Sequence, residues 1–341
     1  MKKSVKILLI CAGVVAVLGI ATGITLGVIF HYEPSEWLVE GDDAVPEMDF
    51  ETALQGITVM ENTWETAPAQ TVVHEIIQSH FDSPLPEGKT EKKAIVIGYD
   101  GCRMDTFRLL ETSKRSAINL LLENGGHAIF TYAGGVNYPA EPTQKTSTAP
   151  GWCSMLTGVL SDVHGVTGNS TPKGVEPKTL LLTLVEDGTI DSSAFYVSWA
   201  THFSTKKGTY RAEKDYAEAK GIPAVYLRAK NDAGTKQNIL DDLAKDDCSD
   251  FIFSTHEYTD HAGHGSGFSL QNIKYVSGFR DAEATGVDII EAVENRPTYD
   301  TEDWLIMITT DHGGIKKNHG GPSIDERITF IVANKELPLA S

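Results

Sequence analysis

The sequence predicts an α/β protein with a mainly parallel central sheet covered by helices on both faces, preceded by one transmembrane helix. Beyond residue 91, apolar β-rich runs alternate with helix-like stretches, and the runs are AIVIGYDG, HAIFTYAGG, SAFYVSW, DFIFSTHE, WLIMITTDHGG and ITFIVAN. Continuous apolar strands between helices are typical of parallel sheets that are buried on both faces. Ligands of such sheets bind beyond the carboxyl ends of the strands, so polar residues that follow these runs are candidate site residues.

The amino-terminal segment predicts a membrane anchor. Residues 7–30 carry no charged side chain, and a helix of this length spans about 36 Å, enough to cross a hydrocarbon core of about 30 Å. The run is longer than the apolar region of a cleavable signal peptide, which favours an uncleaved signal anchor. Three lysines lie within residues 1–6. Lysines beside a membrane span favour the cytoplasmic side, which predicts a single-pass cell-membrane protein with residues 1–6 in the cytoplasm and the chain after residue 30 outside the cell. Gly19, Gly23 and Gly27 share one helix face, which permits a weak homodimer.

The charge of the chain is concentrated in one segment. The formal net charge is −18, and residues 31–90 hold 13 acidic side chains against one lysine. This composition predicts an acidic stalk, and the apolar spacing within residues 70–81 predicts a helix that packs ahead of the main domain. An acidic excess also excludes polymeric nucleic acid as a partner. Three cysteines beyond the anchor make no disulfide framework, although Cys102 and Cys153 could be paired or free.

Three carboxylates and three imidazoles follow the β-rich runs, and they are Asp100, Asp260, His264, Asp311, His312 and His319. Carboxylate and neutral imidazole are the usual zinc ligands of hydrolytic sites. Taken singly, Asp100-Gly101 reads equally well as a turn, and the glycine-rich stretch around His264 as a polar loop. Together, the six side chains suit a site with two metal ions about 4 Å apart.

A hydroxyl-rich segment, KTSTAPGWCSMLTG, spans residues 145–158. Thr148 stands two residues before Pro150, a residue tolerated in the first turn of a helix, so Thr148 is a candidate helix N-cap. A helix N-terminus also presents free N–H groups and a positive dipole end to a phosphate. A nearby metal ion would make the Thr148 hydroxyl a nucleophile, and Ser147 is the alternative.

The order and spacing of these motifs resemble the alkaline phosphatase superfamily, and most closely its type I phosphodiesterase/nucleotide pyrophosphatase branch, over about residues 92–333. The shared motifs are a strand ending in Asp, Thr-x-Pro opening a helix that closes on Thr-Gly, His-Gly with a trailing Asn, Asp-x-x-Gly-His, Asp-His-Gly and a final His-Gly. The resemblance implies an alkaline phosphatase-like fold. It also implies that residues 91–341 form a metal-dependent phosphodiesterase domain.

The resemblance further implies a role for each site residue. Asp260, His264 and His319 would hold one zinc ion. Asp100, Asp311 and His312 would hold the second zinc ion, with Thr148 on it as nucleophile, and other divalent metals are possible. Asn169, together with the backbone N–H after Thr148, would contact the phosphoryl oxygens. The implied function is a membrane-anchored extracellular hydrolase of phosphodiester or pyrophosphate bonds in small molecules.

The chain departs from the family pattern near the nucleophile. Ala149 stands where nucleotide-cleaving relatives often have a Phe that stacks on the base, and Gly151 stands where Asn is frequent. Another aromatic wall could come from Trp152, Trp199, Phe203, Tyr258 or Phe268. Arg103 is the nearest candidate cation, and His256 and His261 could orient Asp260.

Four other functions remain open. A phosphomonoesterase would use the same metals and usually adds a cationic side chain beside the nucleophile. A sulfuryl ester hydrolase would need Cys or Ser in a Cys/Ser-x-Pro-x-Arg setting, which Thr148 lacks. Phospho-group transferases of this kind usually have several membrane spans. An inactive binding protein would be expected to lack one of the ligands.

Overall fold

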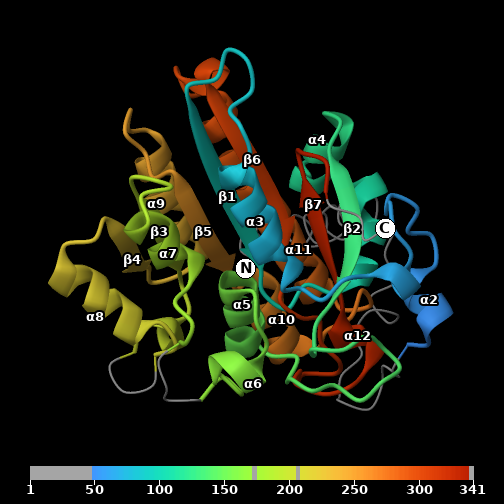
Figure 1. The fold of residues 1–341 in the computed structure, drawn as a ribbon. Helices are drawn as coiled ribbons and strands as arrows, with labels where there is room; N and C mark the ends of the chain where they lie inside the picture. Colours follow the sequence, from blue (N-terminus) through green and yellow to red (C-terminus); the bar gives the residue numbers. More distant parts are fainter. Residues whose placement is uncertain (1–47, 171–174, 205–207, 338–341) are drawn as a thin grey trace, which may run out of the picture. The chain divides into compact units, whose positions relative to one another are not determined.

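The computed structural model describes residues 48–170, 175–204 and 208–337. Within these residues one sheet has the strand order β2-β7-β6-β1-β5-β3-β4 (Figure 1). Its strands are β1 (Glu91–Tyr99), β2 (His127–Tyr132), β3 (Ser193–Val197), β4 (Ala224–Arg228), β5 (Phe251–His256), β6 (Glu302–Thr309) and β7 (Ile328–Ala333). Strands β6, β1, β5, β3 and β4 are parallel, whereas β7 runs antiparallel to both β6 and β2. The predicted mainly parallel sheet is confirmed.

The predicted runs form strands, and the structure adds β4, which the sequence analysis did not predict. Strand β4 is an edge strand in which Val225, Leu227 and Arg228 are exposed. In the central strand β1, by contrast, Ile95, Ile97 and Tyr99 enter one core while Ala94 and Val96 enter the other. A strand buried on both faces reads as a continuous apolar run, which is why β1 was recognisable and β4 was not.

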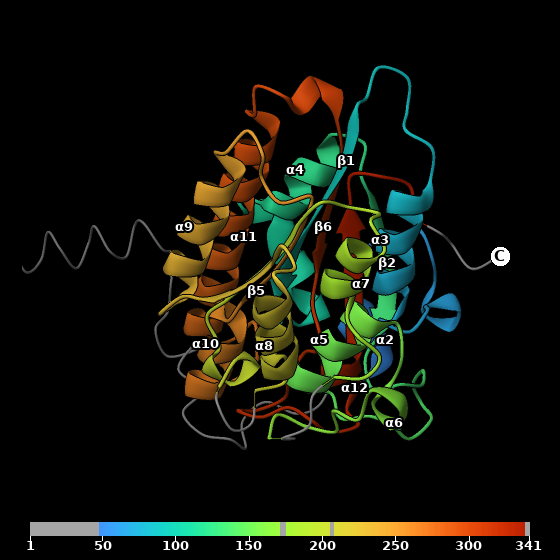
Figure 2. The same cartoon turned by 60° about the vertical axis from the view of Figure 1, so that its left-hand side comes forward.

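Helices cover both faces of the sheet. The α-helices are α2 (Phe50–Leu54), α3 (Val72–Asp82), α4 (Ala117–Glu123), α5 (Thr148–Thr157), α6 (Ser161–His164), α7 (Leu180–Glu186), α8 (Arg211–Lys220), α9 (Asp232–Leu243), α10 (Tyr258–Ser266), α11 (Ile273–Glu294) and α12 (Ile324–Arg327). The 3-10 helices are η1 (Trp64–Thr66), η2 (Met104–Thr112), η3 (Ala200–His202) and η4 (Tyr299–Thr301). Helices α4, α9 and α11 pack on one face, and α3, α5 and α7 pack on the other (Figure 2).

The segment predicted as a stalk is folded from residue 48 onward. Ala53, Trp64 and Ala67 are buried in one core, and the predicted helix over residues 70–81 is α3, which buries its apolar face in the other. Residues 31–47 lie outside the described residues. The acidic segment therefore contributes apolar side chains to the same cores as the sheet.

The predicted anchor, residues 7–30 with Gly19, Gly23 and Gly27, also lies outside the described residues. No helix within the described part of the chain is long and apolar enough to cross a membrane. The question left open for the cysteines is answered, because Cys102, Cys153 and Cys248 are buried and free.

Candidate active site

The candidate site lies where the central strands end. Asp100 directly follows β1, Asp311 follows β6, and α10, which carries Asp260, follows β5. Strand β1 pairs with both β5 and β6 in parallel, so these three carboxyl ends meet at one edge of the sheet. Helix α5, which begins at Thr148, lies at the same edge as α10 (Figure 1).

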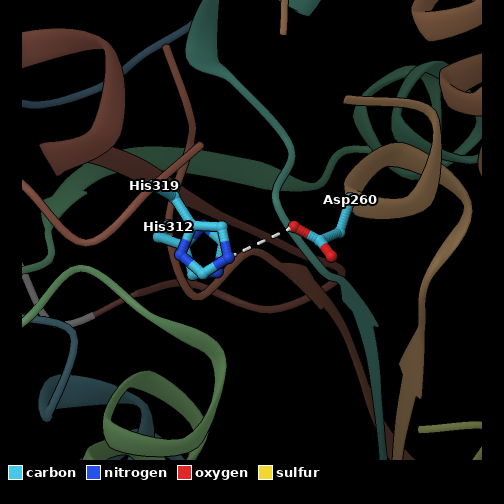
Figure 3. Close-up of side chains that lie close together, drawn as sticks. All are labelled: Asp260, His312 and His319. Atoms are coloured by element: carbon cyan, nitrogen blue, oxygen red, sulfur yellow. Dashed lines mark ion pairs between the residues drawn. The ribbon is translucent and has the colours of Figure 1, made fainter. Parts of the chain in front are cut away.

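One group of metal-ligating atoms comes from Asp260, His312 and His319, whose nearest N and O atoms lie within 4.8 Å of one another. The Nε2 atom of His319 lies 3.6 Å from Asp260 Oδ1, and Figure 3 shows this pair with the His312 ring behind the His319 ring. The Nε2 atom of His264 approaches the same oxygen to 3.4 Å. The structure therefore brings together the three residues predicted for the first metal and sets His312 beside them.

The second group consists of Asp100, Asp311 and His312. His312 Nε2 lies 3.5 Å from Asp100 Oδ1 and 3.4 Å from Asp311 Oδ2. The Thr148 hydroxyl lies 3.4 Å from Asp100 Oδ1 and 3.4 Å from His312 Nε2. All of these side chains are buried, so the hydroxyl sits directly among the residues predicted to hold the second metal.

The three histidines are oriented in the same way. Each Nδ1 contacts a backbone carbonyl, which only accepts hydrogen bonds, so each Nδ1 must carry the proton. The pairs are His264 with Lys317 O at 2.8 Å, His312 with Gly313 O at 2.6 Å and His319 with Thr146 O at 3.1 Å. In the neutral imidazole, each Nε2 is then the unprotonated nitrogen, and it lies on the side of the carboxylates, as in metal-binding histidines.

Among the described residues, the site carboxylates have no Lys or Arg side chain as an ion-pair partner. Burial, and then the charge of Asp260, raise the pKa of Asp100 well above its usual range, and burial followed by the charge of Asp100 does the same for Asp311. Burial raises the pKa of Asp260 to about 7. Asp260 Oδ1 and Asp311 Oδ2 are buried without a hydrogen-bond partner. Divalent cations would neutralise the carboxylates and satisfy these oxygens.

The spacing of the donor atoms fits metal ions. The donor pairs around Asp260 and His312 are separated by 3.4–3.6 Å, too far apart for good hydrogen bonds. Ligands that lie 2.0–2.1 Å from a tetrahedral zinc ion are about 3.3–3.4 Å from each other. Three carboxylates and three neutral imidazoles also match zinc in ligand type. The described residues therefore fit a two-metal centre.

The start of α5 brings Asn169 to the nucleophile segment. Ser147 is the N-cap residue and Thr148 the first helical residue, so the predicted N-cap is displaced by one position. The Ala149 N–H, predicted to contact a phosphoryl oxygen, instead donates to Asn169 Oδ1 at 2.9 Å. This bond orients the Asn169 side chain and leaves its amide NH₂ group as the donor available to a phosphoryl oxygen.

Two residues contribute to the site in ways that were not predicted: Trp152 was predicted only as a possible aromatic wall, and Glu257 was not predicted at all. Trp152 is fully buried, and its indole N–H donates to Asp100 Oδ2 at 2.9 Å, so it positions a ligand and forms no substrate wall. It stands four residues after Thr148 on the same helix face, a spacing that could have revealed it. Glu257 groups with Asp100 and Asp260, and its Oε1 has no hydrogen-bond partner. Its place at the end of the DFIFSTHE run was the available signal.

Arg103, the candidate phosphate-binding cation, is buried and fully engaged by the protein. Its guanidinium pairs with Asp105 at 3.1 Å and Asp325 at 2.8 Å, and donates to Phe268 O at 2.9 Å and Gly314 O at 3.1 Å. Phe268 follows the α10 ligands and Gly314 follows His312. Arg103 therefore ties together two ligand-bearing segments and leaves no donor for substrate.

The other aromatic candidates pack against neighbouring side chains, and the two histidines proposed to orient Asp260 do not hydrogen-bond to it. Phe203 and Phe268 are buried, and Phe268 packs on the rings of His264 and His319. Trp199 packs against the His202 ring, and Tyr258 lies parallel to His256. Both His256 nitrogens lack hydrogen-bond partners and His261 is exposed, so no hydrogen bond from either to Asp260 is found.

Gly151 has a packing explanation. A Cβ atom at this position would lie 2.8 Å from Asp311 Cβ and 3.0 Å from Asp311 O. Only glycine lets α5 approach a metal-ligand candidate this closely. The departure from Asn at this position therefore matches a tight contact between the nucleophile helix and Asp311.

The chain was compared with curated proteins and with solved structures. A search of curated proteins finds no match. Among solved structures, murine ectonucleotide pyrophosphatase/phosphodiesterase 5 is 16% identical, with 65% of this chain and 57% of that chain covered and a TM-score of 0.44. The phosphonate monoester hydrolase of Agrobacterium radiobacter is 12% identical, with 71% and 68% covered and a TM-score of 0.45. Alkaline phosphatase from the Antarctic bacterium TAB5 is 13% identical, with 72% and 91% covered and a TM-score of 0.45.

The family comparison covers most of the chain and all of the predicted site residues. The model of the type I phosphodiesterase/nucleotide pyrophosphatase family matches residues 94–325, from the middle of β1 to the start of α12. The chain spans 57% of the length of the murine protein. The family match nevertheless includes Asp100, Thr148, Asp260, Asp311 and His319. The chain belongs to the type I phosphodiesterase/nucleotide pyrophosphatase family.

Proposed function

We propose that this chain hydrolyses phosphodiester or pyrophosphate bonds of small molecules. Thr148 is the nucleophile, and two divalent cations, which we propose to be zinc, assist the reaction. Asp260, His264 and His319 hold one cation, and Asp100, Asp311 and His312 hold the other. The observation that carries the proposal is the Thr148 hydroxyl, 3.4 Å from both Asp100 Oδ1 and His312 Nε2. A buried hydroxyl among prospective metal ligands is the arrangement required for metal-assisted nucleophilic attack.

The reaction has two steps on the Thr148 oxygen. In the first, the Thr148 hydroxyl releases its proton and its oxygen forms a bond to phosphorus. The ester or anhydride bond breaks, and the leaving oxygen departs with the bonding electrons and takes up a proton from solvent. In the second, water attacks phosphorus, and the bond to Thr148 breaks to restore the hydroxyl. Bound divalent cations lower the pKa of hydroxyl groups and water and stabilise the leaving oxygen. The Asn169 amide NH₂ donates to a phosphoryl oxygen as charge develops there.

The wider organisation is proposed on sequence grounds. Residues 7–30 anchor the chain in the cell membrane, residues 1–6 are cytoplasmic, and residues 91–341 form an extracellular catalytic domain. The long uncharged run and the lysines before it support this topology. A weak homodimer through Gly19, Gly23 and Gly27 is part of the same proposal.

The test is a substrate panel with a matched pair of variants. The zinc-loaded protein is assayed on an aryl phosphodiester, an aryl phosphomonoester and an aryl sulfate. Thr148→Ala should keep its metals and lose at least about a thousandfold in kcat, because the nucleophile is gone. Ser147→Ala is the control, since the Ser147 side chain makes no capping hydrogen bond, and it should stay within a few-fold of wild type. Near-normal turnover by Thr148→Ala, or a preference for the sulfate, would contradict the proposal.

A further inference from the structure

A lysine that the proposed function does not use stands three residues before the nucleophile in the sequence. Lys145 lies three residues before Thr148, and its side chain is exposed. Within the described residues its ammonium group has no hydrogen-bond or ion-pair partner within contact distance. The side chain runs along Gly168, where a Cβ atom would lie 3.8 Å from Lys145 Cδ and 4.0 Å from Nζ. The next residue is Asn169, the prospective phosphoryl contact, so the Lys145 side chain lies against the residue that directly precedes this amide.

The backbone around Lys145 is anchored on both sides. The Gln144 side chain donates to Ser154 Oγ at 2.9 Å and accepts from the Ser161 N–H at 2.7 Å. The Thr146 hydroxyl donates to Gly321 O at 2.9 Å, and the Thr146 carbonyl accepts from His319 Nδ1. The base of the lysine is therefore held at a fixed place relative to α5 and to a prospective metal ligand.

A hollow for a substrate group opens next to this lysine. Residues 141–145 and 320–322 line a cavity of about 260 Å³. The cavity adjoins His319 along the chain, and Lys145 lies on its wall. No aromatic ring of residues 141–145 or 320–322 faces it, because these residues are Glu, Pro, Thr, Gln, Lys and Gly. Ala149 likewise offers no stacking surface, so recognition here must depend on charge and hydrogen bonds.

We propose that Lys145 is a substrate-binding residue that selects phosphate esters carrying more negative charge than a simple diester. This inference rests on the proposed function of the same site. The extra charge can be the second ionised oxygen of a phosphomonoester or the neighbouring phosphate of a pyrophosphate. An ammonium–phosphate hydrogen bond is charge-assisted, and its contribution corresponds to about tenfold or more in affinity. Arg103 cannot take this role, because all its donors are bonded to protein.

The experiment compares three substrates and three variants of the zinc-loaded full chain. The substrates are p-nitrophenyl phosphate, inorganic pyrophosphate and bis(p-nitrophenyl) phosphate, which separate the monoester, pyrophosphate and diester cases. Lys145→Met removes the charge and keeps the apolar stem, Lys145→Arg keeps the charge, and Lys220→Met is the control. Lys220 is an exposed residue at the end of α8, directly before the turn that leads to the amino end of β4.

If Lys145 selects more highly charged substrates, its removal should lower kcat/KM for these substrates more than for the diester. Lys145→Met should lower kcat/KM about tenfold or more for the preferred anionic substrate and less than threefold for the diester. Lys145→Arg should restore most of the loss, and Lys220→Met should match wild type. Equal losses on all substrates, no loss on any, or a wild-type enzyme that hydrolyses only the diester would overturn the inference.

A binding measurement separates this inference from the proposed function. Orthophosphate and dimethyl phosphate are titrated by calorimetry into zinc-loaded Thr148→Ala, with and without Lys145→Met. Lys145→Met should weaken orthophosphate binding about tenfold and leave dimethyl phosphate binding unchanged, whatever the turnover of the wild-type enzyme. Unchanged orthophosphate binding would overturn the role of Lys145. Absent turnover with this binding difference intact would instead overturn the proposed hydrolysis.

Discussion

The two ends of the central sheet differ in whether their buried charged side chains have partners of opposite charge. At the amino end, Glu302 accepts three hydrogen bonds from Arg296 at 2.7, 2.9 and 3.2 Å. It also accepts one from the Thr298 hydroxyl at 2.6 Å and one from the Trp304 indole at 2.7 Å. Burial alone would raise the pKa of Glu302, but these bonds lower it to about 2. Lys93 pairs in the same region with Asp250 at 2.8 Å. Each of these charges has a partner supplied by the protein.

At the carboxyl end, Asp100, Asp260 and Asp311 are buried close to one another, and no Lys or Arg of residues 48–170, 175–204 or 208–337 pairs with them. Their pKa values are raised, chiefly by burial, and two of their oxygens lack hydrogen-bond partners. Unpaired buried carboxylates destabilise a fold, so this end is arranged for something other than the stability of the metal-free chain. The contrast teaches that the amino end contributes stability and the carboxyl end is arranged to receive cations.

The largest effect should come from Asp311→Asn. The change removes one ligand charge but preserves the acceptor for the Gly101 N–H, which lies 3.2 Å from Asp311 Oδ1. We expect kcat/KM at saturating zinc to fall by about a thousandfold or more, since a metal ion contributes several kcal/mol to the transition state. The urea-unfolding free energy of the metal-free protein should stay equal or rise. Asp250→Asn is the same change at the amino end of the sheet. It should leave kcat/KM unchanged and lower the free energy of unfolding.

Arg296→Met should cost about 3–5 kcal/mol of unfolding free energy, because it leaves Glu302 buried without its cation. The zinc affinity and kcat of the folded protein should be unchanged. Arg115→Met is the matched control, since Arg115 pairs with Asp288 and Glu291 on the exposed surface. That change should cost less than about 1 kcal/mol. Equal stability losses in the two variants, measured by urea unfolding, would remove the distinction between buried and exposed pairs.

Trp152→Phe should weaken zinc binding or activity about 10–100-fold, because hydrogen-bond donors to metal ligands tune them by this amount. The indole donates to Asp100 Oδ2 in wild type, and Phe keeps most of the buried ring. Trp304→Phe removes a similar indole–carboxylate bond at the amino end and should leave zinc affinity unchanged. Competition titrations with a chromophoric chelator measure both. Identical zinc affinities in the two variants would argue against a role for Trp152 in positioning Asp100.

The smallest effect concerns the pH dependence of metal-free Asp260→Asn. The pKa of Asp260 is raised from 3.8 to about 7, so its contribution to stability is present below about pH 4 and is lost as the pH rises through 7. Asn does not ionise, so the free energy of unfolding of the variant should rise relative to that of wild type as the pH increases from 4 to 8. With saturating zinc, wild type should have a higher free energy of unfolding than Asp260→Asn.

Glu302→Gln should change stability with pH in the opposite direction to Asp260→Asn. The pKa of Glu302 is lowered to about 2, so its stabilisation is present above its ordinary pKa of 4.5 and is lost as the pH falls through 2. The variant should therefore lose stability relative to wild type, and the loss should grow as the pH rises from 2 to 5. Parallel pH profiles for the Asp260 and Glu302 variants would contradict the difference between the two ends.

Much of the sheet could be predicted because its central strands are buried on both faces. Strand β1 reads as an unbroken apolar run, and a polar residue at its end, Asp100, stands out. The edge strand β4 could not be recognised, because Val225 and Leu227 lie at exposed positions of a short segment. The Asp260–His264 segment reads as a loop for its glycines, yet it forms α10, which sets both side chains one turn apart on one face.

The partners of the prospective ligands were harder to predict, because they come from distant parts of the sequence. Arg103 reads as a substrate cation by its closeness to Asp100, but its partners include Phe268 and Asp325, far along the chain. The Trp152 bond to Asp100 depends likewise on how α5 packs against β1. Residue type and spacing identify which side chains could bind metal, and only the tertiary structure shows what positions them.

The most direct test of the two-metal centre is a calorimetric zinc titration of the metal-free wild-type chain, followed by urea unfolding of the loaded protein. Two zinc ions should bind per chain, and the unfolding free energy should rise by about 4 kcal/mol per site at free zinc a thousandfold above Kd. Asp311→Asn should lose one of the two binding events. Absence of zinc binding, or binding that leaves stability unchanged and survives Asp311→Asn, would contradict the assignment of this buried cluster as a metal centre.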